Sequence, residues 1–126
     1  MTKDGHRIIA VDFDGTLSRA KWPAVGFPND LLFEYLIECK ERGDKIILFS
    51  CRTGDALRAA VMFCNERGLV FDTINENLPE VIEAYGEDPR KVTADVYIDD
   101  RGITADNVIP RWFELEYLIN HTKERG

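Results

Sequence analysis

Ile8-Ile9-Ala10-Val11 runs directly into Asp12-Phe13-Asp14-Gly15-Thr16-Leu17, and this junction is the most informative feature of the chain. The apolar run is rich in β-branched residues and bounded by polar ones, which predicts a buried strand. At the end of a strand, residues i and i+2 point to the same side, so Asp12 and Asp14 would repel one another without a cation between them. A hard divalent cation with oxygen ligands, usually Mg²⁺, meets that need. The junction therefore predicts metal-dependent acid chemistry.

Strand and helix patterns alternate along the rest of the chain, which favours a parallel sheet with helices on its faces. We expect one domain over residues 1–126: an α/β, Rossmann-like, doubly wound sheet with helices on both faces, a short flap at about 17–28 and no large cap domain. The expected strands are 7–12, 45–50, 69–71 and 94–98, with a weak fifth one including Val108 and Ile109. The expected helices are 30–42, a second capped by Thr53 or Asp55 and stopping at Gly68, a third with Asn77 as its N-cap, and 111–122 with Trp112, Leu115, Leu118 and Ile119 facing the core.

Polar residues end three of the predicted strands. Asp12 and Asp14 end the first, Ser50 ends the second, and Asp99 and Asp100 end the fourth. Ligands of open parallel α/β sheets bind outside the carboxyl ends of the strands. If the first and fourth strands are neighbours, up to four carboxylates meet at one point, an arrangement that costs stability without a cation.

Each remaining polar position has a structural alternative beside its functional one. Ser50 either caps a turn or holds a phosphate oxygen together with the backbone N–H groups at Cys51 and Arg52. Arg52 either contacts substrate or pairs with a surface acid. Lys91, with Arg90 beside it, could be the fixed cation of a phosphate site, although surface lysines are usually just solvated. For Asn75 we favour turn chemistry over substrate contact.

Composition narrows the function further. The 126 residues carry a formal net charge of −7, which argues against broad contact with nucleic-acid backbones. No apolar run approaches the roughly 20 residues that a membrane span needs. The three cysteines are an odd number without metal-type spacing, and Cys39 and Cys64 fall on apolar helix stripes. A reduced, cytoplasmic protein fits this composition best.

With these residues in place, the chain resembles the haloacid dehalogenase-like (HAD) phosphohydrolase superfamily. Residues 12–17 match its DxDGT(L) first motif, and residues 47–50 match its apolar run ending in Ser or Thr. Lys91 matches the third-motif basic residue, and residues 96–100 match the fourth motif in its DD form. The order is that of the superfamily, and the resemblance spans nearly the whole chain. Residues 51–54, 75–77 and 97–101 resemble small, uncharacterised bacterial and phage-type capless members.

The resemblance implies a mechanism and a cofactor. Asp12 would be the nucleophile that forms an aspartyl-phosphate, and Asp14 the general acid and then the base. Mg²⁺ would be held by Asp12, the backbone carbonyl of Asp14 and Asp99, with Asp100 ligating directly or through water. Ser50, Cys51 and Lys91 would hold the phosphoryl group.

The resemblance leaves the substrate open. The intervals between motifs leave no room for a large cap, so the flap with Trp22, together with Arg52 and the loop at Asn75, would contact the leaving group. The partner would be a phosphorylated small molecule or a macromolecular end, with long nucleic acids and membranes disfavoured. A homo-oligomer that closes the open site is plausible.

Two other functions compete with a phosphatase. One is a phosphate-sensing or scaffold protein that keeps the fold without turnover. The sequence weighs against this alternative, because every catalytic position is filled. The other is a receiver-like signalling domain, in which the phospho-accepting Asp ends the third strand. Here the complete acidic motif ends the first strand, so the receiver interpretation is weak.

Overall fold

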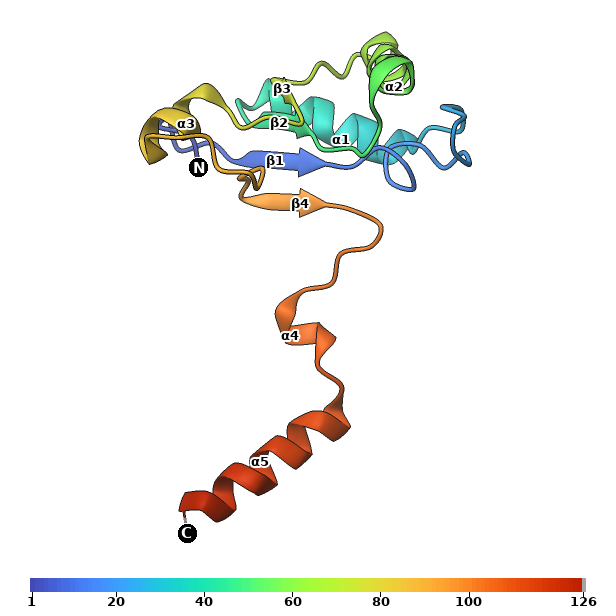
Figure 1. The fold of residues 1–126 in the computed structure, drawn as a ribbon. Helices are drawn as coiled ribbons and strands as arrows, with labels where there is room; N and C mark the ends of the chain where they lie inside the picture. The colour runs from blue at the N-terminus through green and yellow to red at the C-terminus, as the bar shows by residue number, and fades with distance from the viewer. Residues whose placement is uncertain (126) are drawn as a thin grey trace.

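A four-stranded, all-parallel sheet with the strand order β3-β2-β1-β4 forms the centre of the protein (Figure 1). The structure is a computed structural model that describes residues 1–125. The strands are β1 (Ile8–Val11), β2 (Lys45–Leu48), β3 (Thr73–Ile74) and β4 (Val96–Ile98). The helices are α1 (Asp30–Glu41), α2 (Gly54–Glu66), α3 (Pro79–Tyr85), α4 (Ala105–Val108) and α5 (Arg111–Arg125). The predicted α/β class with a Rossmann-like parallel sheet is confirmed.

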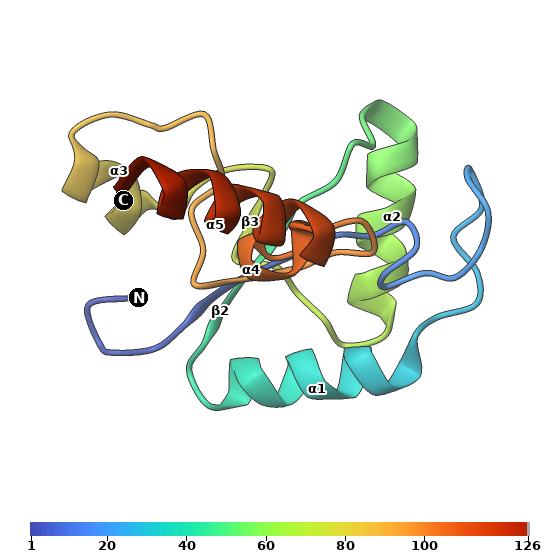
Figure 2. The ribbon, with the colours of Figure 1, turned by 90° about the horizontal axis from the view of Figure 1, so that it is seen from below.

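The two faces of the sheet bury different helices, because successive side chains of a strand point to opposite faces. Ile9 and Val11 of β1 pack in the larger core with residues of α1 and α2, whereas Ile8 and Ala10 pack in a smaller core with Val81 of α3. In the view from below, α1 and α3 lie on opposite sides of the strands (Figure 2). Both faces of the sheet are therefore partly covered. β1, which lies between β2 and β4, is buried on both faces.

Helix α1 shows why the elements form where they do. The Asn29 side chain caps it by accepting a hydrogen bond from the backbone N–H of Leu32 at 3.4 Å. Phe33, Leu36 and Cys39 form its buried stripe, and Gly43 follows the helix with φ +101. The buried Cys39 agrees with its interpretation as a small core residue.

The third strand was predicted at 69–71, and this prediction is wrong. The structure has β3 at Thr73–Ile74. The backbone N–H of Leu69 donates to the carbonyl of Cys64, so this residue closes the end of α2, and its fully buried side chain joins the larger core. Pairing with β2 starts only at Asp72, whose N–H donates to the carbonyl of Ile46. An apolar run that packs at the end of a helix has the same sequence pattern as a short buried strand.

Two expectations for the C-terminal part are also wrong. Val108 and Ile109 do not form a fifth strand, because the N–H groups of Asn107 and Val108 fold back onto the carbonyl of Thr104 and Pro110 lacks a donor. The helix from Arg111 exists, but its apolar side chains are not core residues. Every residue from 99 to 122 is exposed, and this segment leads away from the sheet (Figure 1).

None of the helices within residues 1–125 combines the length and the apolar character needed to cross a membrane.

Candidate functional site

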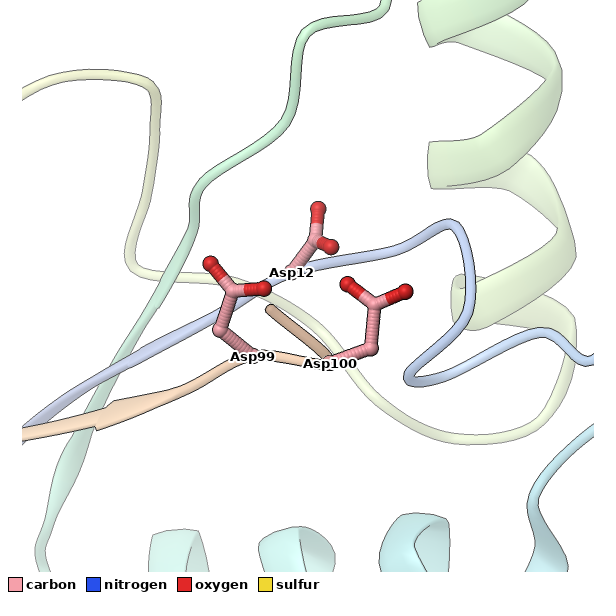
Figure 3. Close-up of side chains that lie close together, drawn as sticks. All are labelled: Asp12, Asp99 and Asp100. Atoms are coloured by element: carbon pink, nitrogen blue, oxygen red, sulfur yellow. The ribbon is translucent and has the colours of Figure 1, made fainter. Parts of the chain in front are cut away.

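The ends of β1 and β4 bring three carboxylates together. Val11 pairs with Ile98 in the parallel register, and the backbone N–H of Asp12 then donates to the carbonyl of Ile98 at 3.0 Å. The residues that follow this pair, Asp12 and Asp99, are therefore neighbours. With Asp100 they offer one carboxylate oxygen each within 4.8 Å of one another. Figure 3 shows the three side chains converging above the strand ends.

Gly15 makes room for this cluster. Its φ of +79 is one that L side chains rarely adopt, and a Cβ added there would lie 2.8 Å from Cγ of Asp100 and still closer to its Oδ2. The glycine of the DxDGT motif is therefore required twice, by its backbone conformation and by the position of Asp100.

The cluster is electrostatically unfavourable by itself. Burial raises the pKa of Asp12 to about 6; a hydrogen bond from the backbone at Phe13 opposes this, and the charges of Asp99, Asp100 and Asp14 add to it. The only backbone donor to the Asp99 carboxylate among the described contacts is the N–H of Arg101, at 2.9 Å. No Lys or Arg among the described side chains forms an ion pair with the three carboxylates.

Asp14 has a different environment. Nε of Arg52 donates to Asp14 Oδ2 at 2.9 Å, and Nη2 donates to Oδ1 at 2.7 Å. The Arg52 side chain is 1% exposed, whereas that of Asp14 is 35% exposed. Arg52 thus holds the carboxylate from the interior, and Asp14 keeps its open side toward the pocket described below. Each Asp14 oxygen retains lone-pair capacity for a further partner.

Arg52 also binds the flap, the segment 17–28 between the first motif and α1. Nη1 donates to the carbonyl of Pro23 at 3.2 Å, and Nη2 donates to the carbonyl of Ala24 at 2.9 Å. The guanidinium carbon lies 4.7 Å from the ring centroid of Trp22. Arg52 was predicted to contact substrate or a surface acid; instead it is buried and joins Asp14 to the flap.

Ser50 and Asn75 shape the turn after β2. The Ser50 hydroxyl accepts from the backbone N–H of Arg52 at 3.1 Å, and the Ser50 N–H donates to the side-chain carbonyl of Asn75 at 2.8 Å. Asn75 itself has φ +54, a conformation that Asn tolerates better than most residues. Both residues therefore make the turn contacts that were one of their two interpretations, and the Ser50 hydroxyl proton remains available to a ligand.

A pocket of about 260 Å³ joins these strand ends, and it includes the exposed Cys51. It is lined by Asp12, Asp14, Phe49, Ser50, Cys51, Asp99, Asp100 and Arg101. Five predicted carboxylate and turn positions, Asp12, Asp14, Ser50, Asp99 and Asp100, thus share one cavity. Arg101 is the lining cation that the sequence analysis did not assign to the site. Its position directly after the acidic pair was the available signal.

Lys91 lies outside this pocket. It lines a neighbouring cavity of about 620 Å³ that shares Asp99 and Phe49 with the first, and its Nζ is 5.2 Å from the ring centroid of Tyr97. In this conformation Lys91 faces Tyr97, with Asp99 between the two cavities.

Asn77 holds the loop that carries Lys91. It was predicted to cap α3, and this prediction is wrong, since the N-cap is Leu78 and no side chain caps the helix. The buried amide of Asn77 donates to Asp88, to the carbonyl of Pro89 and to the carbonyl of Lys91, and it accepts from the N–H of Thr93. This residue was missed as a support of the site because its sequence context is also that of a helix start.

The donor set fits a hard divalent cation. Three carboxylates offer oxygen ligands at the mouth of a pocket, and Gly15 leaves Asp100 the space to approach the other two. The resemblance implies that Asp14 binds the metal through its backbone carbonyl. Its carboxylate pairs with Arg52, and this contact leaves the backbone carbonyl free for that role. A cation of this kind would remove the mutual repulsion of Asp12, Asp99 and Asp100.

The fold and the pocket define an α/β protein with an acidic site at the carboxyl ends of its parallel strands. Among solved structures, the chain is similar to the conserved protein coded by a locus of Bacteroides thetaiotaomicron, with 33% identity over 93% of this chain and 92% of that chain, and a TM-score of 0.69. The chain belongs to the same family as that protein. No protein-family model matches the chain, and no curated protein matches it.

Proposed function

We propose that the protein is a Mg²⁺-dependent phosphohydrolase that cleaves a phosphomonoester through an aspartyl-phosphate on Asp12. The observation that carries this proposal is the convergence of Asp12, Asp99 and Asp100 within 4.8 Å, with no protein cation paired to them among the described side chains. Such a group of carboxylates gains nothing for folding, and it suits a phosphate only when a metal is bound.

Asp12 is the nucleophile in this proposal. One of its carboxylate oxygens attacks phosphorus, the bond from phosphorus to the leaving-group oxygen breaks, and that oxygen takes up the proton of the Asp14 carboxyl group. Mg²⁺ held by Asp12, Asp99 and Asp100 would offset the repulsion between the carboxylates and the phosphoryl oxygens. Asp12 is the least exposed member of the cluster and directly follows the central strand β1, which supports this role because a fixed carboxylate is held in place for attack.

Asp14 is the general acid and general base in this proposal. It is 35% exposed toward the pocket and lies two residues from the nucleophile, so it can reach both the leaving-group oxygen and an incoming water. In the second step water loses a proton to Asp14 and attacks phosphorus, the bond to the Asp12 oxygen breaks, and inorganic phosphate leaves. Ser50 and Cys51 line the same pocket. In this proposal the Ser50 hydroxyl and the backbone N–H of Cys51 donate to the phosphoryl oxygens.

Phosphate release from a panel of phosphomonoesters, measured with and without Mg²⁺, tests the proposal. We expect turnover that requires Mg²⁺ and disappears in Asp12→Asn. Acid quenching should trap a phosphoryl group on the peptide containing residue 12 in the wild type and none in Asp12→Asn. Asp106→Asn is the matched control, because Asp106 is an exposed acid on α4 outside the site.

The outcome also separates the competing functions. Turnover that survives in Asp12→Asn would overturn the aspartyl-phosphate mechanism. Binding of Mg²⁺ and phosphate to the wild type, without release of phosphate from any panel member, would favour the phosphate-sensing protein instead.

A further inference from the structure

We propose that Arg52 is a positioning residue that couples the flap (17–28) to the orientation of Asp14, so that the order of the flap decides whether Asp14 can transfer protons. This inference rests on the proposed function, because it concerns the same site. It adds a residue whose role lies neither in substrate binding nor in metal binding.

All five N–H groups of Arg52 have hydrogen-bond partners. Two donate to the carboxylate oxygens of Asp14, two donate to the flap carbonyls of Pro23 and Ala24, and one donates to the carbonyl of Ala56 at 3.2 Å. A guanidinium has five donors in a fixed planar fork, so no donor is left for a substrate. Four of its five donors are thus divided equally between Asp14 and the flap.

The Arg52 side chain is also buried. Arg52 is 2% exposed, and its guanidinium carbon lies between two aromatic rings, at 4.8 Å from the centroid of Phe13 and 4.7 Å from that of Trp22. A buried charge persists only when its partners are complete. Among the described side chains, Asp14 is the one carboxylate that pairs with it. If either Asp14 or the flap carbonyls move away, the guanidinium is left buried with unmet donors.

The tip of the flap, residues 21–24, has few contacts apart from those with Arg52. The base of the flap is held independently, because Leu17 and Ser18 are fully buried and Val25 packs against the larger core. Trp22 is 60% exposed, and the residues around it, 21–24, are all exposed. The hydrogen bonds within the flap are two backbone ones, from Arg19 to Phe27 and from Ala24 to Lys21, both at 2.9 Å, and those of the Ser18 hydroxyl. The Arg52 contacts therefore order the tip of the flap, and the same side chain sets the direction of Asp14.

A double-mutant cycle on turnover tests the catalytic half of the proposal. We expect Arg52→Lys, which keeps a charge but loses the fork, to lower kcat by about 10²-fold while KM and the Mg²⁺ requirement stay near wild type. In the Asp14→Asn background, the same change should alter kcat by no more than about twofold, because Arg52 then has nothing to orient. Equal effects in both backgrounds would overturn the proposal, since a residue that only stabilises the fold costs the same in each. Arg58→Lys, an exposed arginine of α2, is the matched control.

Amide hydrogen exchange tests the coupling without any turnover. We expect Asp14→Asn to speed exchange at the N–H groups of Arg19 and Ala24 by about tenfold, because the unpaired guanidinium no longer holds the flap. Asp55→Asn, which removes an exposed acid, should leave exchange unchanged. Unchanged flap exchange in Asp14→Asn would overturn the coupling.

These two measurements separate failure of the inference from failure of the proposed function. A wild type that turns over no substrate contradicts the phosphohydrolase, while flap exchange still decides the coupling. If Arg52→Lys does not fold, the exchange comparison of Asp14→Asn with Asp55→Asn still decides the coupling, because neither variant alters Arg52 or the flap.

Discussion

Asp14 and the cluster of Asp12, Asp99 and Asp100 lie in one pocket but differ in the source of their positive charge. Asp14 has a buried guanidinium on both of its oxygens, at 2.7 and 2.9 Å. The cluster has three carboxylates within 4.8 Å and no ion-pair partner among the described side chains. The protein itself supplies a counter-charge to Asp14, whereas the described side chains supply none to the other three carboxylates.

The difference predicts that removal of a carboxylate changes the free energy of unfolding in opposite directions at the two places. Removing a carboxylate that has its cation leaves a buried charge behind and destabilises the fold. Removing a carboxylate from an unneutralised cluster relieves repulsion and stabilises the metal-free fold. Four measurements test this difference.

The largest effect should follow from separating Arg52 from its carboxylate. We expect Asp14→Asn to lower the free energy of unfolding by about 3 kcal/mol, because it leaves the buried guanidinium of Arg52 without a negative partner. Urea denaturation of the metal-free protein measures this change. Glu38→Gln is the control, since its ion pair with Arg42 is exposed on both sides and should be worth less than about 0.5 kcal/mol. Equal effects of the two changes would show that the charge of Arg52 does not depend on Asp14.

The next effect should come from the external cation. Mg²⁺ that binds only the folded protein should add about 2.7 kcal/mol to the free energy of unfolding when its free concentration is about 100 times Kd. The reason is that it supplies the charge that Asp12, Asp99 and Asp100 lack. Thermal unfolding across a Mg²⁺ titration measures it, and the gain should vanish in Asp99→Asn. A gain that is the same in both proteins would place Mg²⁺ elsewhere.

A smaller effect should follow from crowding the cluster. Gly15→Ala should cost about 1–2 kcal/mol through its positive φ and should also weaken Mg²⁺ binding, because the new Cβ displaces Asp100. Calorimetric titration with Mg²⁺ measures the second effect. Gly86→Ala is matched, because its φ is also +79 but a Cβ there meets nothing within 4 Å. It should lose stability and keep Mg²⁺ affinity. Unchanged binding in Gly15→Ala would mean that Asp100 is not a ligand.

The sequence was sufficient to predict the cluster but not the neutralisation of Asp14. Asp12 and Asp99 each directly follow a buried strand, and a parallel register makes such residues neighbours whatever the surrounding loops do. Arg52 comes from the turn after β2 and reaches Asp14 across 38 residues of sequence. That pairing depends on the path of the flap, for which a local pattern carries no information.

The C-terminal segment shows the same limit for apolar residues. The periodicity of Trp112, Leu115, Leu118 and Ile119 correctly predicts a helix, since it reflects only the local repeat. The surface that such a stripe packs against is not encoded in the period, and in the structure all four side chains remain at least 49% exposed. Asn77 is the polar counterpart: its sequence context predicted a helix cap, but tertiary contacts use the amide to hold the 88–93 loop.

The smallest effect is a pH dependence that arises from Asp12. Burial raises its pKa from an ordinary 3.8 to about 6 in the metal-free protein. Between these values the folded protein holds a proton that the unfolded chain has released, so stability falls as pH rises from about 4 to about 6 and then levels off. Because Asp12 is only half-buried, solvent limits the contribution to about 1 kcal/mol.

The comparison of wild type with Asp12→Asn isolates this contribution, since other groups titrate equally in both proteins. We expect the variant to be the more stable one at pH 7 without metal, by about 1 kcal/mol, and the difference to disappear near pH 4. Saturating Mg²⁺ should reverse the order at pH 7, because the cation favours the charged carboxylate that Asn lacks. A wild type that is already the more stable protein at pH 7 without metal would mean that the cluster carries no net repulsion, and the contrast with Asp14 would fail.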